Sequence, residues 1–179
     1  MKLSITTRCL LAACVAAPLA SAVATVDGSH DFDFEHGKWH VHHRVLAKDG
    51  SWKEFDGTSN DYPAQDGAIN IEENTFFRPG GTTQGTAVRT YDRETGQWAI
   101  WWFDSRTPLA TKDPPNIGRF ENGVGRFYCD ITDHGKTTRT RYTWTHRDAD
   151  HAHWEQATSE DAGKTWNTNW VMELERDAK

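Results

Sequence analysis

Apolar and polar residues alternate with a period of two along most of this 179-residue chain. Such alternation puts successive side chains on opposite faces of an extended strand and is typical of a sheet with one buried face. Turns that contain glycine, such as Lys48-Asp49-Gly50, separate the alternating segments as in β-hairpins. The segments predicted as strands are 37–46, 51–59, 68–77, 83–91, 97–105, 118–120, 125–130, 137–146, 151–158 and 166–175.

The order of these segments predicts the fold. None of them repeats apolar residues at helical spacing, and short turns join them in sequence, which favours an all-β meander over an α/β fold. We therefore expect one domain, a closed antiparallel up-and-down barrel of about eight to ten strands, because closure removes the unpaired edges of an open sheet. A β-sandwich is the alternative. Pairing between the first and last strands would exclude it.

Two segments stand out from the regular pattern. The strand 97–105, Q-W-A-I-W-W-F-D-S, has Trp98 and Trp102 on one face and Trp101 and Phe103 on the other, which indicates burial on both sides or a ligand on one. Segment 107–115 contains several prolines and cannot be a regular strand. It is the best candidate for a lid or a rim loop.

The N-terminus has the features of a secretory signal peptide: basic residues, an uncharged apolar run and then small residues. Cleavage after Ala24, or alternatively after Ala22, would leave a mature domain of residues 25–179 in the periplasm or outside the cell. The sequence before Cys14 resembles a lipobox, but only five residues separate Arg8 from Cys14, which is too short for such a leader. No membrane insertion is expected after cleavage.

The mature domain would be acidic and could form no internal disulfide. Cleavage removes two of the 20 Lys and Arg residues and none of the 26 Asp and Glu residues, so 18 positive against 26 negative groups give a formal charge of −8. This charge makes nucleic acid a poor partner. Cys9 and Cys14 leave with the signal, and Cys129 remains alone. The oligomeric state is not indicated.

Gly37-Lys38-Trp39 opens the first predicted strand and resembles the G-x-W signature of the lipocalin and calycin superfamily, in which the tryptophan closes one end of the barrel. Longer stretches narrow the resemblance: D-F-D-F-E-H-G-K-W-H-V-H-H-R (31–44), W-F-D-S-R (102–106), D-P-P (113–115) and W-E-Q-A-x-S-x-D-x-G-x-x-W-x-x-N-W (154–170). Together they resemble the DUF1579-like calycin proteins, a bacterial family of unknown function. The resemblance implies the fold and no catalytic residue.

Ser159-x-Asp161-x-Gly163-x-x-Trp166 matches the Asp-box pattern of sialidases and other β-propellers. In this pattern the aspartate caps a hairpin turn and the glycine supplies a positive φ. A glycosidase or calcium site is the functional interpretation. We prefer a turn in the last hairpin, because the box occurs on unrelated β folds.

Histidines gather in two places, and strand parity divides the first group. His40 and His42 share a face, whereas His43 lies with Trp39 on the face that the superfamily resemblance directs inward. His146, His151 and His153 form the second group, of which the last two are expected near the surface. An interior His43 could act as a general acid or base, or as an axial haem ligand as in the related nitrobindins, or simply as a core histidine.

Charged residues within apolar strands and a surplus of tryptophan point to the barrel interior as the site. Burying a charge is costly unless it is paired, so Arg89, Asp104, Arg106, Arg139, Arg141 and Glu155 either face solvent or join a polar network. All nine tryptophans fall in predicted strands, which favours flat walls for an apolar or aromatic ligand.

The leading hypothesis is an exported protein that binds a small hydrophobic or aromatic molecule inside its barrel. The predicted ligand-binding residues are His43, Arg89, Trp102, Asp104, Tyr142 and Trp154. The alternative is a cofactor-free lyase, isomerase or hydratase on the same barrel, with His43, Asp104 and Glu155 as catalytic groups. A haem or nitric-oxide carrier is a further alternative. No metal ligands and no resident cofactor are expected beyond that haem.

Overall fold

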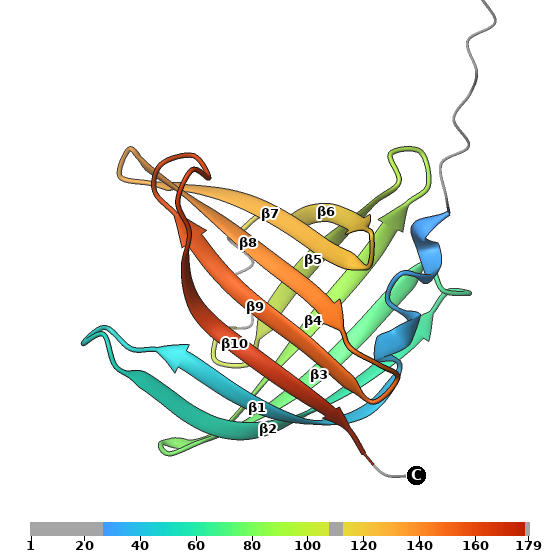
Figure 1. Ribbon diagram of the computed structural model, residues 1–179, viewed down its shortest axis with the longest axis horizontal. Helices are drawn as coiled ribbons and strands as arrows, with labels where there is room; N and C mark the ends of the chain where they lie inside the picture. Colours follow the sequence, from blue (N-terminus) through green and yellow to red (C-terminus); the bar gives the residue numbers. More distant parts are fainter. Residues whose placement is uncertain (1–26, 108–112, 178–179) are drawn as a thin grey trace, which may run out of the picture.

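Ten antiparallel strands close into one barrel (Figure 1). The computed structural model describes residues 27–107 and 113–177. The strands are β1 (Gly37–Leu46), β2 (Trp52–Ala64), β3 (Ile69–Arg78), β4 (Gly81–Asp92), β5 (Gln97–Asp104), β6 (Asn116–Glu121), β7 (Val124–Asp133), β8 (Lys136–His146), β9 (His151–Ser159) and β10 (Asn167–Arg176).

Each strand pairs with its neighbours in sequence, and β1 pairs with β10 to close the sheet. This closing register runs from Trp39 opposite Arg176 to Val45 opposite Trp170. The pairing of first and last strands confirms the predicted up-and-down barrel and excludes a sandwich. The segment limits were also close to the observed ones, with β2 the main exception, because it continues past Ser59 to Ala64.

Two short 3₁₀ helices, η1 (Gly28–His30) and η2 (Asp33–Glu35), lie beside one end of the barrel (Figure 1). Trp39 is fully buried beneath them, and its indole N–H donates to the Glu35 carbonyl at 2.6 Å. The Arg176 guanidinium lies 4.0 Å above the Trp39 ring and donates to the carbonyls of His36 and Phe34. The tryptophan of the G-x-W motif therefore closes this end, as predicted.

Of the two alternatives for β5, burial on both faces is wrong, and a ligand on one face stays a prediction. Trp98 is buried and Trp102 lines the interior, but Trp101 faces outward and both Trp101 and Phe103 are exposed. Alternation alone gives two faces, and only packing decides whether both are covered. Nothing in the described part of the chain covers this outer face. The aromatic surplus on the outside of β5 is thus not part of the core.

The Asp-box forms the turn between β9 and β10, as predicted. Asp161 accepts hydrogen bonds from the backbone N–H groups of Lys164 and Thr165, and Gly163 has a φ of 87°. The Trp166 indole N–H donates to the Gly163 carbonyl at 3.0 Å. These bonds satisfy the backbone of the turn.

Three expectations concern residues outside the described ranges. The signal peptide, the rejected lipobox and most of the predicted rim loop fall within residues 1–26 and 108–112. Within the described ranges, the chain has no helix long and apolar enough to span a bilayer.

Candidate binding cavity

A cavity of about 250 Å³ lies inside the barrel. A second hollow of about 380 Å³ adjoins it and shares five lining residues with it: Ile100, Trp102, Asp113, Tyr142 and Gln156. Both therefore belong to one interior space. Proteins commonly bind small molecules in concave, largely apolar spaces of this kind, with a few polar groups that orient the ligand.

Aromatic side chains from five strands form the walls. They are Phe76 on β3, Trp102 on β5, Tyr142 and Trp144 on β8, Trp154 on β9 and Trp170 on β10. The rings of Tyr142 and Trp154 lie 5.1 Å apart, and those of Trp154 and Trp170 5.9 Å apart. Because alternate residues of a strand face inward, the period of two brings these rings together.

A glycine makes room for one of these walls. A Cβ atom at Gly85 on β4 would overlap the ring of Trp102 on the neighbouring strand. The absence of a side chain lets the indole lie against β4 instead of filling the cavity. Gly85 is therefore part of what keeps the interior space open.

Three of the tryptophans that line the cavity form no hydrogen bond with a described residue through their indole N–H groups. The indoles of Trp39, Trp98, Trp166 and Trp170 donate to protein atoms. Among the described residues, no acceptor is present for the cavity indoles of Trp102, Trp144 and Trp154. A buried N–H group normally finds a partner. The walls thus offer hydrogen-bond donors to whatever fills the space.

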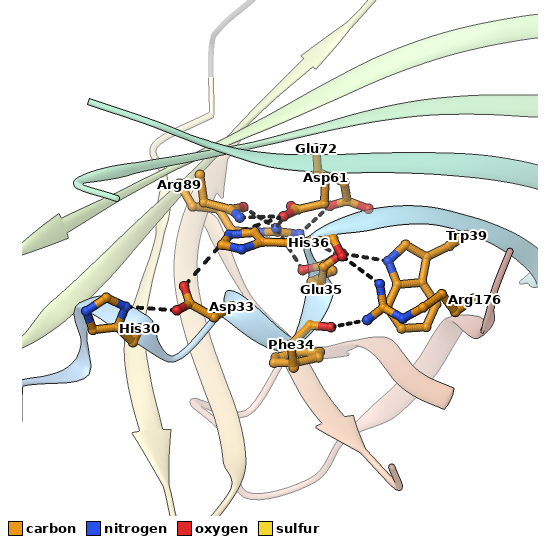
Figure 2. A network of polar contacts seen from close by, with 11 residues as sticks. His30, Asp33, Phe34, Glu35, His36, Trp39, Asp61, Glu72, Arg89 and Arg176 are labelled. Atoms are coloured by element: carbon orange, nitrogen blue, oxygen red, sulfur yellow. Dashed lines mark hydrogen bonds and ion pairs between the residues drawn. The ribbon is translucent and has the colours of Figure 1, made fainter. Parts of the chain in front are cut away.

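A charged network underlies the cavity at the end that the 3₁₀ helices cover (Figure 2). Arg89 on β4 is buried and binds three carboxylates: Glu35 of η2 at 2.8 Å, Asp61 of β2 at 2.9 Å, and Glu72 of β3. Its guanidinium also donates to the Asn70 side chain at 2.5 Å. Arg89 and Glu72 line the cavity, so the network contacts the cavity contents.

Burial, together with the closeness of other carboxylates, raises the pKa of two carboxyl groups in this network. Burial raises the pKa of Asp61 to about 7, against the attraction of Arg89, and the Glu72 carboxylate adds to the rise. Burial also raises the pKa of Glu35 well above its ordinary value. The Arg89 guanidinium stays charged because the three carboxylates outweigh the effect of its own burial. One cation thus holds three carboxyl groups that cannot all be ionised together.

Two asparagines leave polar atoms unsatisfied beside the cavities. The Asn74 Oδ1 atom is buried without a partner among the described residues, and Asn74 lines the first cavity. The Asn116 Nδ2 atom is likewise unpartnered, and Asn116 lines the adjoining hollow. Unpaired buried polar groups are costly, so a ligand that pairs with them would gain affinity.

His43 faces inward, as predicted, but it does not line either cavity. Its ring stacks on Phe55 with centroids 4.8 Å apart, and its Nδ1 accepts from the Trp170 indole N–H at 3.3 Å. Burial lowers the pKa of His43 to about 3, so the imidazole is neutral. His43 therefore positions Trp170, which does line the cavity.

This geometry does not fit haem ligation by His43. The second ring nitrogen, Nε2, faces β2, where a Cβ atom at Gly57 would lie only 2.8 Å away. With Nδ1 occupied by Trp170 and Nε2 against the strand backbone, neither nitrogen is directed to an iron in the cavity. His43, the residue that suggested a haem site, therefore does not offer an axial ligand to a haem in the cavity.

The other predicted site residues divide between the cavity and the outside. Arg89, Trp102, Tyr142 and Trp154 line the first cavity, and Asp104 lines the adjoining hollow. Asp104 is paired with Arg106 at 2.5 Å, and this hydrogen bond lowers the pKa of the Asp104 carboxyl.

Glu155 lines neither space, because it lies between the inward Trp154 and Gln156 on β9. Adjacent residues of a regular strand point to opposite faces, so Trp154 and Glu155 could not both face the ligand. Sequence reasoning missed Glu35, Asp61, Glu72 and Asn74, which the network and the cavity bring together.

Comparison with known proteins supports the fold and leaves the family open. No protein-family model and no curated protein matches the chain. Among solved structures, the S-type phycobiliprotein lyase CPES from Guillardia theta is similar over 86% of this chain and 94% of its own, with a TM-score of 0.60 and 10% identity. Rv2717c from M. tuberculosis is similar over 86% and 99%, with a TM-score of 0.58 and 9% identity. These similarities support the fold alone, a closed antiparallel barrel of ten strands.

Proposed function

We propose that the barrel binds one small, flat, hydrophobic or aromatic molecule in its interior cavity. The observation that supports this proposal is a space walled largely by tryptophan and tyrosine rings, in which the indole N–H groups of Trp102, Trp144 and Trp154 form no hydrogen bond with a described residue. Such walls favour planar ligands through stacking, and their polar edges favour ligands that also carry hydrogen-bond acceptors.

The polar residues that line the cavity narrow the class of ligand. Glu72 and the unpartnered Asn74 Oδ1 would accept hydrogen bonds, so we propose that the deep end of the ligand carries an N–H or O–H group. The unpartnered Asn116 Nδ2 in the adjoining hollow would pair with an acceptor further along the molecule. Tyr142 stays a neutral phenol because burial raises its pKa to about 12, and it adds a donor to the wall.

The test is a binding titration with a matched pair of variants. Trp102 and Trp101 are neighbours on β5 with almost equal exposure, 39% and 38%, but Trp102 lines the cavity and Trp101 faces outward. A panel of planar fluorophores, including 1-anilinonaphthalene-8-sulfonate, is titrated and followed by fluorescence and by melting temperature. We expect binding that weakens at least tenfold in Trp102→Ala and stays unchanged in Trp101→Ala. Equal effects of both variants would refute the cavity as the site.

A second candidate function is a cofactor-free lyase, isomerase or hydratase. The observation in its favour is the proton-holding network of Arg89 with Glu35, Asp61 and Glu72, because an acid with a raised pKa near 7 suits proton transfer at neutral pH. A barrel of the same fold bears the name of a phycobiliprotein lyase. The acid is Asp61, and Glu72, which belongs to the same network and lines the cavity, would contact the substrate instead of His43 or Glu155.

The test of this second function separates binding from turnover. Glu72→Gln keeps the shape of the side chain but cannot release a proton. With a substrate identified by mass spectrometry of the co-purified small molecule, we expect Glu72→Gln to bind it and not to convert it. Unchanged turnover in Glu72→Gln would eliminate the catalytic proposal and leave the binding proposal intact.

We also propose that this binding protein is exported and belongs to the DUF1579-like calycins. The signal-like N-terminus supports export to the periplasm or the medium, and the motifs around Trp39 and Asp161 support the family. The intact mass of protein recovered from the periplasm tests the cleavage, which we expect after Ala24. A retained N-terminus would contradict it.

A further inference from the structure

The outer face of β1, β10 and β9 carries histidines and glutamates in a regular cross-strand pattern. In each of two rows, a glutamate of β10 lies between a histidine of β1 and a histidine of β9. The rows are His42–Glu173–His153 and His40–Glu175–His151.

All six side chains line one surface hollow of about 400 Å³. The histidines come from two H-x-H segments more than one hundred residues apart in the sequence, which the pairings of β1 with β10 and of β10 with β9 bring into the same register. These strands lie side by side in Figure 1. The three strands thus assemble a set of imidazole and carboxylate groups that no single segment contains.

This donor set suits a divalent transition-metal ion. Imidazole nitrogen and carboxylate oxygen are the ligands that zinc, copper and nickel ions take in proteins. Neighbouring strands are about 4.8 Å apart, so His42 and His153 flank Glu173 across roughly 10 Å. Two imidazoles extended toward each other can bridge such a span through one ion, with metal–nitrogen distances of about 2.0–2.1 Å.

The side chains of the first row are partly assembled for such a site. The His153 Nδ1 atom lies 2.8 Å from the Glu173 carboxylate, and the His42 Nδ1 atom lies 2.9 Å from the Asp56 carboxylate. In the described part of the chain no three such groups yet converge on one point. The His42 side chain is 44% exposed, so it can leave Asp56 and turn toward Glu173 without repacking the core.

The second row is less available. His151 is paired with the turn residue Asp148 at 2.7 Å, and this hydrogen bond holds the pKa of the Asp148 carboxyl well below its usual range. In the first row His153 already pairs with the central Glu173, whereas in the second row neither histidine forms an ion pair with Glu175 among the described residues. The first row is therefore closer to a binding site.

We propose that the outer face of β1, β10 and β9 binds a zinc, copper or nickel ion through His42, Glu173 and His153. The site lies on the opposite side of the barrel wall from the cavity, because the alternate residues Val41, Met172 and Trp154 face inward. Metal binding here is independent of the ligand proposed for the interior. It would link three strands across the β1–β10 seam and stabilise the closed barrel.

The experiment uses the mature protein without any histidine tag, freed of metal with a chelator. Zn²⁺ is titrated by isothermal calorimetry into the wild type, His42→Ala, His153→Ala and the control His134→Ala, whose side chain is 96% exposed and outside the hollow. Circular dichroism and the metal-free melting temperature establish that each variant is folded. Mg²⁺ is titrated as a second control, because it prefers oxygen ligands and retains its water.

We expect one Zn²⁺ per chain, a rise in melting temperature on binding, and at least tenfold weaker binding in His42→Ala and His153→Ala. His134→Ala should bind like the wild type, and Mg²⁺ should not bind. With Cu²⁺, the electron paramagnetic resonance spectrum should show coupling to two nitrogen ligands in the wild type and one in each single variant. Absent Zn²⁺ binding, binding unaffected by both substitutions, or equal binding of Mg²⁺ would overturn the proposal.

Discussion

The protonation state of Asp61 can be tested through the pH dependence of the free energy of unfolding. Its pKa is about 7 in the folded chain and 3.8 in an ordinary environment, so the folded state binds a proton between these pH values that the unfolded state has released. Stability from this group is fully present below pH 4 and is lost as pH rises through 7. Asp61→Asn mimics the protonated form at every pH and should therefore escape this loss.

The magnitude follows from the difference between the two pKa values. Each pH unit between them changes the free energy of unfolding by about 1.4 kcal/mol per proton, so the total difference is about 4 kcal/mol. At pH 4 the wild type and Asp61→Asn should agree within about 1 kcal/mol, because both side chains are neutral and can bond Arg89 and Asn70. At pH 8 the variant should be the more stable protein by about 4 kcal/mol.

The assay is urea unfolding followed by circular dichroism at pH 4, 5, 6, 7 and 8. The quantity compared is the difference between variant and wild type, because other groups also titrate. His43 acts in the opposite direction: its pKa is lowered to about 3, so its contribution to stability grows as pH rises from 3 to 6.5. A difference between Asp61→Asn and the wild type that does not change with pH would refute a protonated Asp61.

Three further predictions concern the cavity wall, the closed end and the last turn. Gly85→Val should push the Trp102 ring into the cavity, weaken fluorophore binding at least tenfold and cost about 1–3 kcal/mol in urea unfolding; unchanged binding would contradict it. Arg176→Met should cost about 3 kcal/mol, since it removes the cation above Trp39 and two charged hydrogen bonds, and a loss below 1 kcal/mol would contradict this role. Asp161→Ala should lower the melting temperature by calorimetry without affecting fluorophore binding, and weakened binding would instead indicate a site at the turn.

The alternation of apolar and polar residues predicted most of the fold, because every strand of a closed barrel has one face toward the interior and one toward solvent. The same parity separated His43 from His42, as the structure has them. Trp102 and Tyr142 were predicted as ligand-binding residues and do line the cavity, but parity alone could not choose the inward face of their strands. Parity could not show whether the outer face was covered. The sequence therefore left open whether β5 is buried on both sides or contacts a ligand on one, and the exposed Trp101 excludes the first alternative.

The charged network could not be predicted from local patterns. Asp61 lies in a polar stretch after Ser59 that resembles a turn, and Glu72 lies among polar residues of β3. They face inward only because β2, β3 and β4 align them with Arg89, which is 28 residues from Asp61 in the chain. A buried arginine does require carboxylate partners, so Arg89 was the signal that could have prompted a search for them.

The most direct test of ligand binding in the cavity observes the nine indole N–H groups by nuclear magnetic resonance during a titration with the best fluorophore of the panel. The proposed site predicts large shifts for Trp102, Trp144 and Trp154, whose side chains line the cavity. The signals of the outward Trp101 and the turn residue Trp166 should stay in place. Shifts confined to Trp101 and Trp166, with the cavity indoles unmoved, would contradict the central claim.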